Sequence, residues 1–305
     1  MQRTKTIIHF IFFGNYFYGF CTIGLSIEAS LQQQLPLNPL LYYILLFAVT
    51  VLYYTKAYIT NTTYNTNNKR TLWYIQHRKL VIYSQLLLTL IGIICLGILL
   101  KDIWKNVLQM QWQSWALLLI FPMVAAFYYG IENRKFGKYN LRNTGFLKPF
   151  VIGFVWGGLV TVYPFLFYTI EKNIHLHIAF INCLLFIKNF MFVTVLCIMF
   201  DIKDYAADYN QQLKTFVVRV GLRKTIFLII IPLCVIGFGT FLIYSTSQHF
   251  SLIRILLNAI PFVLLLVVAY SLHRRQSILY YLIIIDGLML AKAFFGTIAT
   301  IYFQT

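Results

Sequence analysis

Acidic side chains are scarce in this chain of 305 residues: eight Asp and Glu stand against 25 Lys and Arg. Charged residues of both signs make up only 11 % of the sequence, whereas soluble globular domains usually carry about 25 %. Hydrophobic residues account for 60 %. This composition excludes a soluble globular domain and predicts a polytopic membrane protein.

Cysteine is also rare, and its spacing excludes two common uses. The five cysteines all lie in apolar runs, with no Cys-x-x-Cys pair and no neighbouring histidine cluster. Disulfide frameworks and zinc sites depend on such patterns, so we expect neither. The cysteines are interpreted as small core residues; they are Cys21, Cys95, Cys183, Cys197 and Cys234.

Long apolar runs, in contrast, are abundant. A transmembrane helix needs about 20 mostly apolar residues, and backbone groups in lipid must be satisfied within the segment, which favours helices at these lengths. We therefore predict an all-α membrane protein with a single polytopic transmembrane domain over residues 1–305, a bundle of about nine helices. The apolar stretches are 7–26, 39–59, 81–100, 114–130, 147–169, 177–199, 225–244, 252–271 and 278–301.

The basic residues alternate between the two sides of this predicted bundle. Eighteen of the 25 Lys and Arg fall on the side of the amino terminus, four on the other side and three within spans. The positive-inside rule then predicts a cytoplasmic amino terminus and an outside carboxyl terminus. The segments 61–80, 131–148 and 201–224 would form a cytoplasmic polar cap.

This topology predicts an integral, multi-pass membrane protein, in the inner (cytoplasmic) membrane if the cell is prokaryotic. Its formal net charge is +17. Membrane lipids are the expected partners of basic loops, and the charge is not accompanied by a nucleic-acid-binding signature. We therefore expect no nucleic-acid partner. No particular oligomeric state is predicted.

Three of the eight acidic residues gather in one short segment, Asp201-Ile-Lys-Asp204-Tyr-Ala-Ala-Asp208, directly after the apolar run 180–200. If the helix continues past Phe200, offsets of three and seven residues place the three carboxylates on one face. One or two carboxylates, completed by water and substrate phosphate, are the usual protein ligands of Mg²⁺. The segment therefore predicts a magnesium site.

The same segment continues into Lys214-Thr215 and Val217-Val-Arg-Val-Gly221. In order and spacing it resembles the second aspartate motif of the UbiA superfamily of intramembrane prenyltransferases, with Gln212 in place of the usual glycine. The resemblance implies a UbiA-like bundle of about nine helices over essentially the whole chain, although only this segment is specific.

The first aspartate motif of that superfamily should follow the second helix, and here it is degenerate. Asn61 and Arg70 match the family pattern, while Thr62, Asn65 and Lys69 stand where the three aspartates would be. Neutral oxygens can complete a Mg²⁺ shell but bring no charge to it. Three readings stay open: the cation rests on the Asp201 segment alone, Lys69 and Arg70 hold phosphate directly, or the ancestral chemistry has been lost.

The resemblance implies a Mg²⁺-dependent transferase that moves an isoprenyl group from its diphosphate to an aromatic or lipid acceptor. Metal ions and basic side chains would stabilise the departing diphosphate. By this resemblance Asp201 and Asp204 hold Mg²⁺, and both act catalytically with Asp208. The implied diphosphate-binding residues are Asn61, Asn65, Arg70, Lys148 and Lys214.

Two other functions remain alternatives. A degenerate UbiA homologue without transferase activity would bind an isoprenoid lipid or a protein partner, or act as a terpene cyclase. A transporter is suggested by the ionisable Lys188, Asp286 and Lys292 inside apolar runs, because such residues often mark ion pathways. The absence of an evident inverted repeat argues against the transporter.

Overall fold

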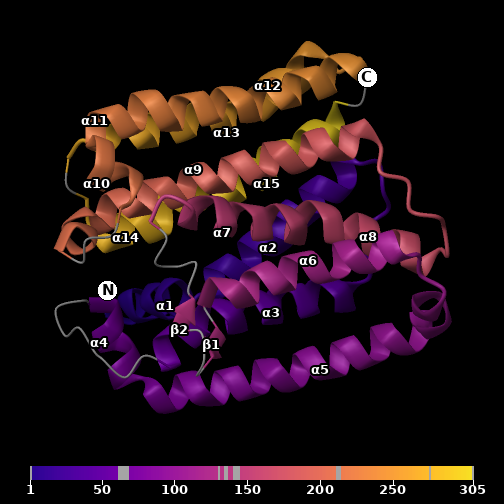
Figure 1. Cartoon of the computed structure of the whole chain (residues 1–305), viewed down its shortest axis with the longest axis horizontal. Helices are drawn as coiled ribbons and strands as arrows, with labels where there is room; N and C mark the ends of the chain where they lie inside the picture. Colours follow the sequence, from indigo (N-terminus) through magenta and orange to yellow (C-terminus); the bar gives the residue numbers. More distant parts are fainter. Residues whose placement is uncertain are drawn as a thin grey trace. The chain divides into compact units, whose positions relative to one another are not determined.

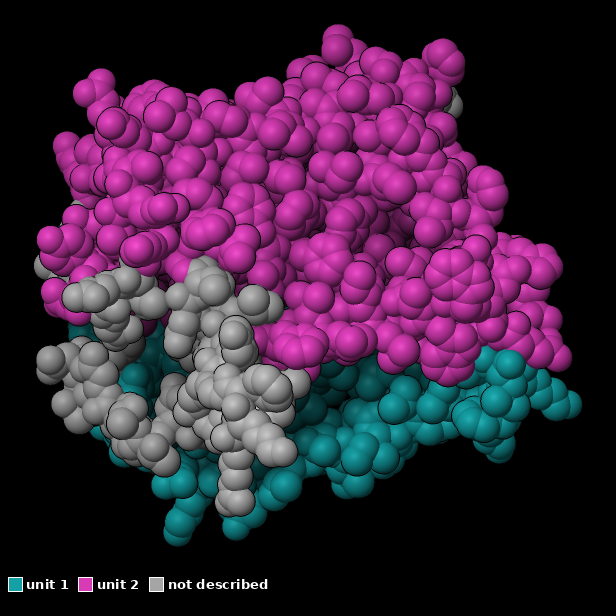
Figure 2. All heavy atoms as spheres, viewed as in Figure 1, with its two compact units in different colours: residues 1–24, 37–108 teal, residues 25–36, 109–305 magenta. Residues whose placement is uncertain are grey.

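The computed structural model of the chain describes residues 2–60, 69–129, 131–133, 137–139, 145–210, 214–274 and 276–303. The chain divides into two compact units, coloured separately in Figure 2. Unit 1 comprises Met1–Gly24 and Leu37–Leu108, and unit 2 comprises Leu25–Pro36 and Gln109–Thr305.

Unit 1 is built from α1 (Gln2–Phe13), the first half of α2 (Tyr16–Gln32), α3 (Leu40–Thr60), α4 (Lys69–Gln76) and α5 (Arg78–Leu108). The long helices α3 and α5 pack against each other, and Gly92 of α5 lies next to Ala48 and Leu45 of α3. A small residue at such a contact lets two helices approach closely.

The break between α1 and α2 occurs at Asn15. Its φ of 66° lies in the left-handed region, which Asn tolerates better than most residues because its short polar side chain can bond locally. The two helices are bent by 61° at this point, so they form either one broken span or a re-entrant segment. The predicted first stretch, 7–26, is therefore not one straight helix.

Unit 2 holds most of the remaining helices, and Figure 1 shows the long α9, α12 and α13 within it. The helix α9 packs against both α7 and α12, and α13 packs against α15. Besides the second half of α2, the elements of unit 2 are α6 (Trp112–Tyr129), β1 (Ile131–Asn133), β2 (Gly137–Tyr139), α7 (Lys148–Gly157), η2 (Gly158–Val162), α8 (Tyr163–Glu171), α9 (Phe180–Asn210), α10 (Phe216–Val220), α11 (Leu222–Thr225), η3 (Ile226–Ile230), α12 (Ile231–Ser247), α13 (Leu252–Ser271), α14 (Ile278–Tyr280), η4 (Tyr281–Ile285) and α15 (Gly287–Tyr302).

The helical membrane architecture is confirmed. Seven helices of the described chain are long and apolar enough to cross a membrane, and the bent α1–α2 pair would be an eighth. The predicted stretch 114–130 corresponds to a shorter apolar helix, Trp112–Tyr128. The count of nine and the orientation of the termini stay predictions.

The three segments of the predicted polar cap contain regular secondary structure. Segment 131–148 includes the antiparallel pair β1–β2, with Ile131 opposite Tyr139. Parts of 61–80 and 201–224 are helical, in α4, the end of α9, α10 and α11. In α4 the buried side chains are Arg70, Trp73 and Tyr74, a spacing that gives a short helix one packed face. Because most residues of 61–80 are polar, the spacing of the buried side chains in α4 was not recognised from the sequence.

Of the three π-helical turns in the described residues, two end two positions before a proline. The turn η2 precedes Pro164 at the start of α8, and η3 precedes Pro232 at the start of α12. Proline lacks the amide hydrogen that would bond one turn back, and its ring crowds that carbonyl. Local widening to π geometry is a known way in which membrane helices accommodate proline.

A buried ion cluster ties together three helices of unit 2. The Glu28 carboxylate accepts hydrogen bonds from Lys188 Nζ at 3.1 Å and from Lys292 Nζ at 2.5 Å. All three side chains are at most 3 % exposed. Gln32 joins them, since its Oε1 accepts from Lys188 Nζ at 2.6 Å and its Nε2 donates to Asn258 at 3.0 Å. Pairing offsets much of the cost of burying these charges.

Gly296 makes room for this cluster. A Cβ atom at Gly296 would lie 2.5 Å from Glu28 Oε1 and 2.7 Å from its Cγ, so the paired carboxylate would have to move. We expect Gly296→Ala to lower the free energy of unfolding in detergent by about 1–3 kcal/mol, the usual cost of overpacking.

The matched control is Gly239→Ala in α12, where an added Cβ meets no atom within 4 Å. Because Ala favours a helix over Gly by up to about 1 kcal/mol, this variant should unfold at the same or a slightly higher temperature. Equal thermal stability of the two variants would contradict the role given to Gly296.

Candidate functional site

The acidic segment is helical, as its spacing predicted. Helix α9 runs without interruption from Phe180 to Asn210, so Asp201, Asp204 and Asp208 lie along one side of its last turns. The helix continues beyond the apolar run because the residues after Phe200 still include good helix formers and no glycine or proline.

Asp201 is the most deeply buried of the three aspartates. It is 0 % exposed, and its Oδ1 accepts a hydrogen bond from Lys148 Nζ at 2.8 Å. Lys148 is the first residue of α7, where Pro149 follows within the first turn, a favoured position for proline. The ion pair therefore connects the start of α7 to the end of α9. Asp201 Oδ2 is buried and has no hydrogen-bond partner.

Asp208 and Thr215 add two further unpartnered oxygens. Asp208 is 7 % exposed and Thr215 is 1 % exposed, and neither Asp208 Oδ2 nor Thr215 Oγ1 has a partner. Burial raises the pKa of the Asp208 carboxyl above its ordinary value, Lys148 and Lys203 oppose that rise, and Asp204 adds to it. The charge of Lys148 thus acts on Asp208 as well as on Asp201.

The other two predicted residues of this segment lie nearer the surface. Asp204 pairs with Lys203 at 3.1 Å, and its side chain is 43 % exposed. Lys214 is exposed at the start of the turn that leads into α10. Gly145 fixes this turn, because a Cβ at Gly145 would lie 2.4 to 2.6 Å from the backbone of Lys214 and Thr215.

The predicted first-motif residues are in unit 1 and only partly described. Asn61, Thr62 and Asn65 lie outside the described residues, whereas Lys69 is exposed at the start of α4. Arg70 is 7 % exposed, and its guanidinium donates to the Phe13 carbonyl through Nε at 3.2 Å and Nη2 at 3.1 Å. Arg70 thereby supplies a hydrogen-bond donor to a carbonyl in the last turn of α1, where carbonyl groups lack partners within the helix.

Asn15 and two tyrosines complete the environment of Arg70. Asn15 Oδ1 accepts from Arg70 Nη2, and Asn15 Nδ2 donates to Tyr74 Oη at 3.0 Å. Tyr74 Oη donates to the Phe13 carbonyl at 2.8 Å, while the Tyr58 ring faces the guanidinium at 4.5 Å. Arg70 is thus engaged at the helix break in this structure, and its predicted contact with diphosphate stays a prediction.

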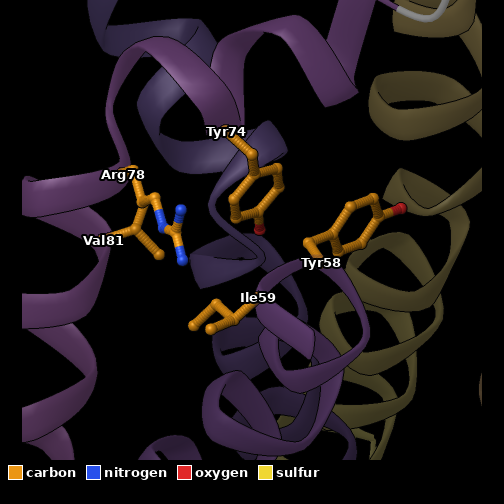
Figure 3. A pocket seen from close by; sticks show the side chains of 5 residues that line it. All are labelled: Tyr58, Ile59, Tyr74, Arg78 and Val81. Carbon is orange, nitrogen blue, oxygen red and sulfur yellow. The ribbon is translucent and has the colours of Figure 1, made fainter. Parts of the chain in front are cut away.

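A small pocket opens beside this network, still within unit 1. Figure 3 shows its lining side chains, Tyr58, Ile59, Tyr74, Arg78 and Val81. Arg78 is exposed and extends toward the side on which Tyr74 lies (Figure 3). The pocket brings one cation and two aromatic rings together, but it contains none of the predicted site residues.

The acidic segment offers oxygen atoms that could bind a metal ion. Within the described residues, no three His, Cys, Asp or Glu side chains come together as a metal-binding group. The unpartnered buried oxygens on Asp201, Asp208 and Thr215 are nevertheless hard donors, and Mg²⁺ is usually bound through one or two carboxylates plus water and phosphate. The residues present fit that kind of site.

No protein-family model and no curated protein matches this chain. A solved structure of a digeranylgeranylglyceryl phosphate synthase in membranes does match, over 99 % of this chain and 99 % of that one. The TM-score is 0.54 at 13 % sequence identity. The fold is UbiA-like. This agrees with the resemblance of the Asp201 segment, which is the part of the sequence that first indicated the superfamily.

The sequence did not indicate one residue and one contact of this candidate site. Thr215 was part of the recognised Lys-Thr pair but was not proposed as an oxygen donor, although its position after Lys214 was the available signal. The direct pairing of Lys148 with Asp201 was also missed, because 53 residues separate them and no local spacing indicates their contact.

A double-mutant cycle tests the Lys148–Asp201 pair. Lys148→Met leaves the Asp201 carboxylate buried without its cation, so we expect it to lower the free energy of unfolding by about 3 kcal/mol. Adding Asp201→Asn to Lys148→Met should recover most of that loss. Thermal unfolding of the four proteins in detergent measures the coupling, and additive effects would show that the two side chains do not interact.

The role of Arg70 at the helix break is testable by amide hydrogen exchange. Arg70→Lys removes the two-pronged bond to the Phe13 carbonyl, so amides of α1 should exchange about tenfold faster, as expected for the loss of one charge-assisted hydrogen bond. Arg78→Lys, which alters an exposed arginine of the same unit, is the control and should leave α1 unchanged. Equal exchange in all three proteins would contradict this role.

Proposed function

We propose that this protein is an intramembrane prenyltransferase that moves an isoprenyl group from its diphosphate to an aromatic or lipid acceptor. Three observations support the proposal: the UbiA-like fold, the matching order of residues from Asp201 to Gly221, and the cluster of buried Asp201 and Asp208 with the partly exposed Lys148. The observation that carries it is the cluster, because it supplies unpartnered oxygens and a cation at the matching segment.

The reaction would proceed by breaking the bond between the allylic carbon and the diphosphate oxygen. The bonding electron pair leaves with the diphosphate, the acceptor's nucleophilic atom forms the new bond to that carbon, and the acceptor releases a proton. Binding the substrate and the transition state equally well does not speed the chemical step. The site must therefore stabilise the negative charge that develops on the departing diphosphate.

The residues of unit 2 would divide this task. Asp201 and Asp208 each have a buried oxygen without a hydrogen-bond partner and would hold one Mg²⁺. Asp204, the predicted second metal ligand, has a more exposed side chain. Mg²⁺, when bound, neutralises charge on the diphosphate oxygens. Lys148 and Lys214 would contact the diphosphate, and Lys148 would exchange part of its bond to Asp201 for a phosphate oxygen.

Only one cation is proposed, because the first motif brings no carboxylates. Thr62, Asn65 and Lys69 stand at its three aspartate positions, and a lysine repels a nearby metal ion. The single acidic segment of α9 would then be the sole metal site.

The test is incubation of the purified chain in lipid with labelled geranyl, farnesyl and longer diphosphates, with and without Mg²⁺. Diphosphate release should require Mg²⁺ and fall about 10²- to 10³-fold in Asp208→Asn, the size of effect seen when one charge-stabilising group is removed. Asp102→Asn, at an exposed position of α5, should retain full activity.

A second measurement separates binding from turnover. Mg²⁺ together with a diphosphate should raise the unfolding temperature of the wild type and should not raise that of Asp201→Asn or Asp208→Asn. Release that is unchanged in both aspartate variants would overturn the metal assignment, whatever the stability data show.

The degenerate first motif keeps one alternative open, a UbiA-like protein that binds an isoprenoid without transferring it. The engagement of Arg70 with Phe13 and Asn15 favours this alternative, since it occupies a side chain expected to contact diphosphate. Stabilisation by isoprenyl diphosphate without any release would support binding alone.

A further inference from the structure

The amino-terminal end of α13 lacks the side-chain cap that helices usually have. Its N-cap residue is Ser251, with φ −60° and ψ 151°, and the Ser251 side chain makes no capping hydrogen bond. The Ser251 Oγ atom is buried and has no partner. A helix start leaves its first amide groups without intrahelical partners and carries positive partial charge, and nothing in the described side chains neutralises it here.

Arg254 adds a full positive charge to the same helix end. It lies in the first turn of α13, is 5 % exposed, and reaches back so that its guanidinium lies 3.4 Å from the ring centroid of Phe250. Its Nε has no hydrogen-bond partner, and no ion pair of Arg254 occurs among the described residues. A cation near a helix amino terminus is unfavourable unless an anion accompanies it.

The neighbouring charges of unit 2 do not supply that anion. Glu28, the buried carboxylate of the nearby cluster, already pairs with both Lys188 and Lys292. Asn258, one turn further along α13, donates to the Arg254 carbonyl rather than accepting from its guanidinium. Buried positive charge therefore exceeds buried negative charge around the start of α13.

We propose that the start of α13 binds a phosphate group, with Arg254, Ser251 and the free amides of the first turn as its ligands. Helix amino termini bind phosphate through exactly such amides, and the planar guanidinium matches phosphate oxygens in pairs. Cation stacking on Phe250 holds the guanidinium in place for this contact.

The source of the phosphate is an anionic phospholipid head group. Three apolar side chains of the same helix start are widely exposed: Leu252 at 71 %, Ile253 at 52 % and Leu256 at 56 %. The helix is long and apolar enough to cross a membrane, so these side chains face acyl chains. A lipid bound there would place its head group at the first turn and its chains along the exposed stripe.

The test uses the purified full chain in phosphatidylcholine micelles titrated with phosphatidylglycerol, and in parallel with inorganic phosphate. Thermal unfolding and native mass spectrometry report stabilisation and retained lipid. The wild type should be stabilised by phosphatidylglycerol and should retain one such lipid. In Arg254→Gln the lipid concentration for half-maximal stabilisation should rise about tenfold, the loss expected for one charge-assisted contact.

Two further variants keep the test decisive. Ser251→Asp places a carboxylate at the N-cap, where it accepts the free amides and pairs with Arg254 in place of a lipid. It should fold with raised stability in phosphatidylcholine and lose the increment from phosphatidylglycerol. Lys172→Gln removes an exposed basic charge at the C-cap of α8 and should respond to phosphatidylglycerol as the wild type does.

The outcomes distinguish a lipid head group from free phosphate, or show that the start of α13 binds neither. An increment from phosphatidylglycerol that is lost in Ser251→Asp and weakened in Arg254→Gln supports a lipid head group. The same pattern with inorganic phosphate alone supports the phosphate site but with a free ion as its source. No preference for phosphatidylglycerol over phosphatidylcholine in the wild type, or an undiminished preference in Ser251→Asp, overturns the proposal.

Discussion

The ion pair between Lys148 and Asp201 holds the start of α7 against the end of α9, and the acidic site is arranged around it. Asp201 is completely buried. A carboxylate in that environment requires a positively charged side chain or a metal ion to offset its lost hydration. Lys148 supplies one such charge at 2.8 Å and also acts on Asp208. The remaining oxygens of both aspartates are left free of hydrogen bonds, which gives the site capacity for a further cation.

The same constraint explains other polar clusters of unit 2. Glu28 serves two lysines, and Gly296 leaves space for its carboxylate. The guanidinium of Arg254 lies over the Phe250 ring, and none of the ion pairs found in the described residues includes Arg254. Because eight acidic residues stand against 25 basic ones, most basic side chains cannot have a carboxylate partner within the chain. Both proposals place a phosphate group beside a cation: a substrate diphosphate would approach Lys148, and a lipid head group would approach Arg254.

Local patterns predicted the parts of the structure that depend on short spacing. Apolar runs gave the membrane helices, and the intervals between Asp201, Asp204 and Asp208 predicted that all three would share one side of a continuous helix. The order of residues up to Gly221 indicated the UbiA-like fold, which the solved synthase structure bears out. The polar composition of 61–80 and 131–148 predicted only a polar cap, because a short helix and two paired strands of three residues each carry little periodicity.

Contacts between distant segments were beyond such reasoning. Lys188 pairs with Glu28, which is 160 residues away, and no local spacing indicates that contact. Arg70 was expected at a diphosphate, yet in this structure it caps α1, because Asn15 breaks the first span and exposes the Phe13 carbonyl. The partners of Lys188 and Arg70 could not be identified from the sequence. Several apolar runs contain a polar group at a similar depth, and the packing of the helices determines which of these groups come into contact.

The most direct test of the single acidic site is a count of bound metal ions. Mn²⁺, which suits the same carboxylate and phosphate ligands, can be titrated into the purified chain with an unreactive isoprenyl thiodiphosphate and followed by electron paramagnetic resonance. We predict one tightly bound Mn²⁺ per chain in the wild type and none in the Asp201→Asn/Asp208→Asn variant. Two bound ions, or one that persists in that variant, would contradict a metal site formed by the α9 aspartates alone.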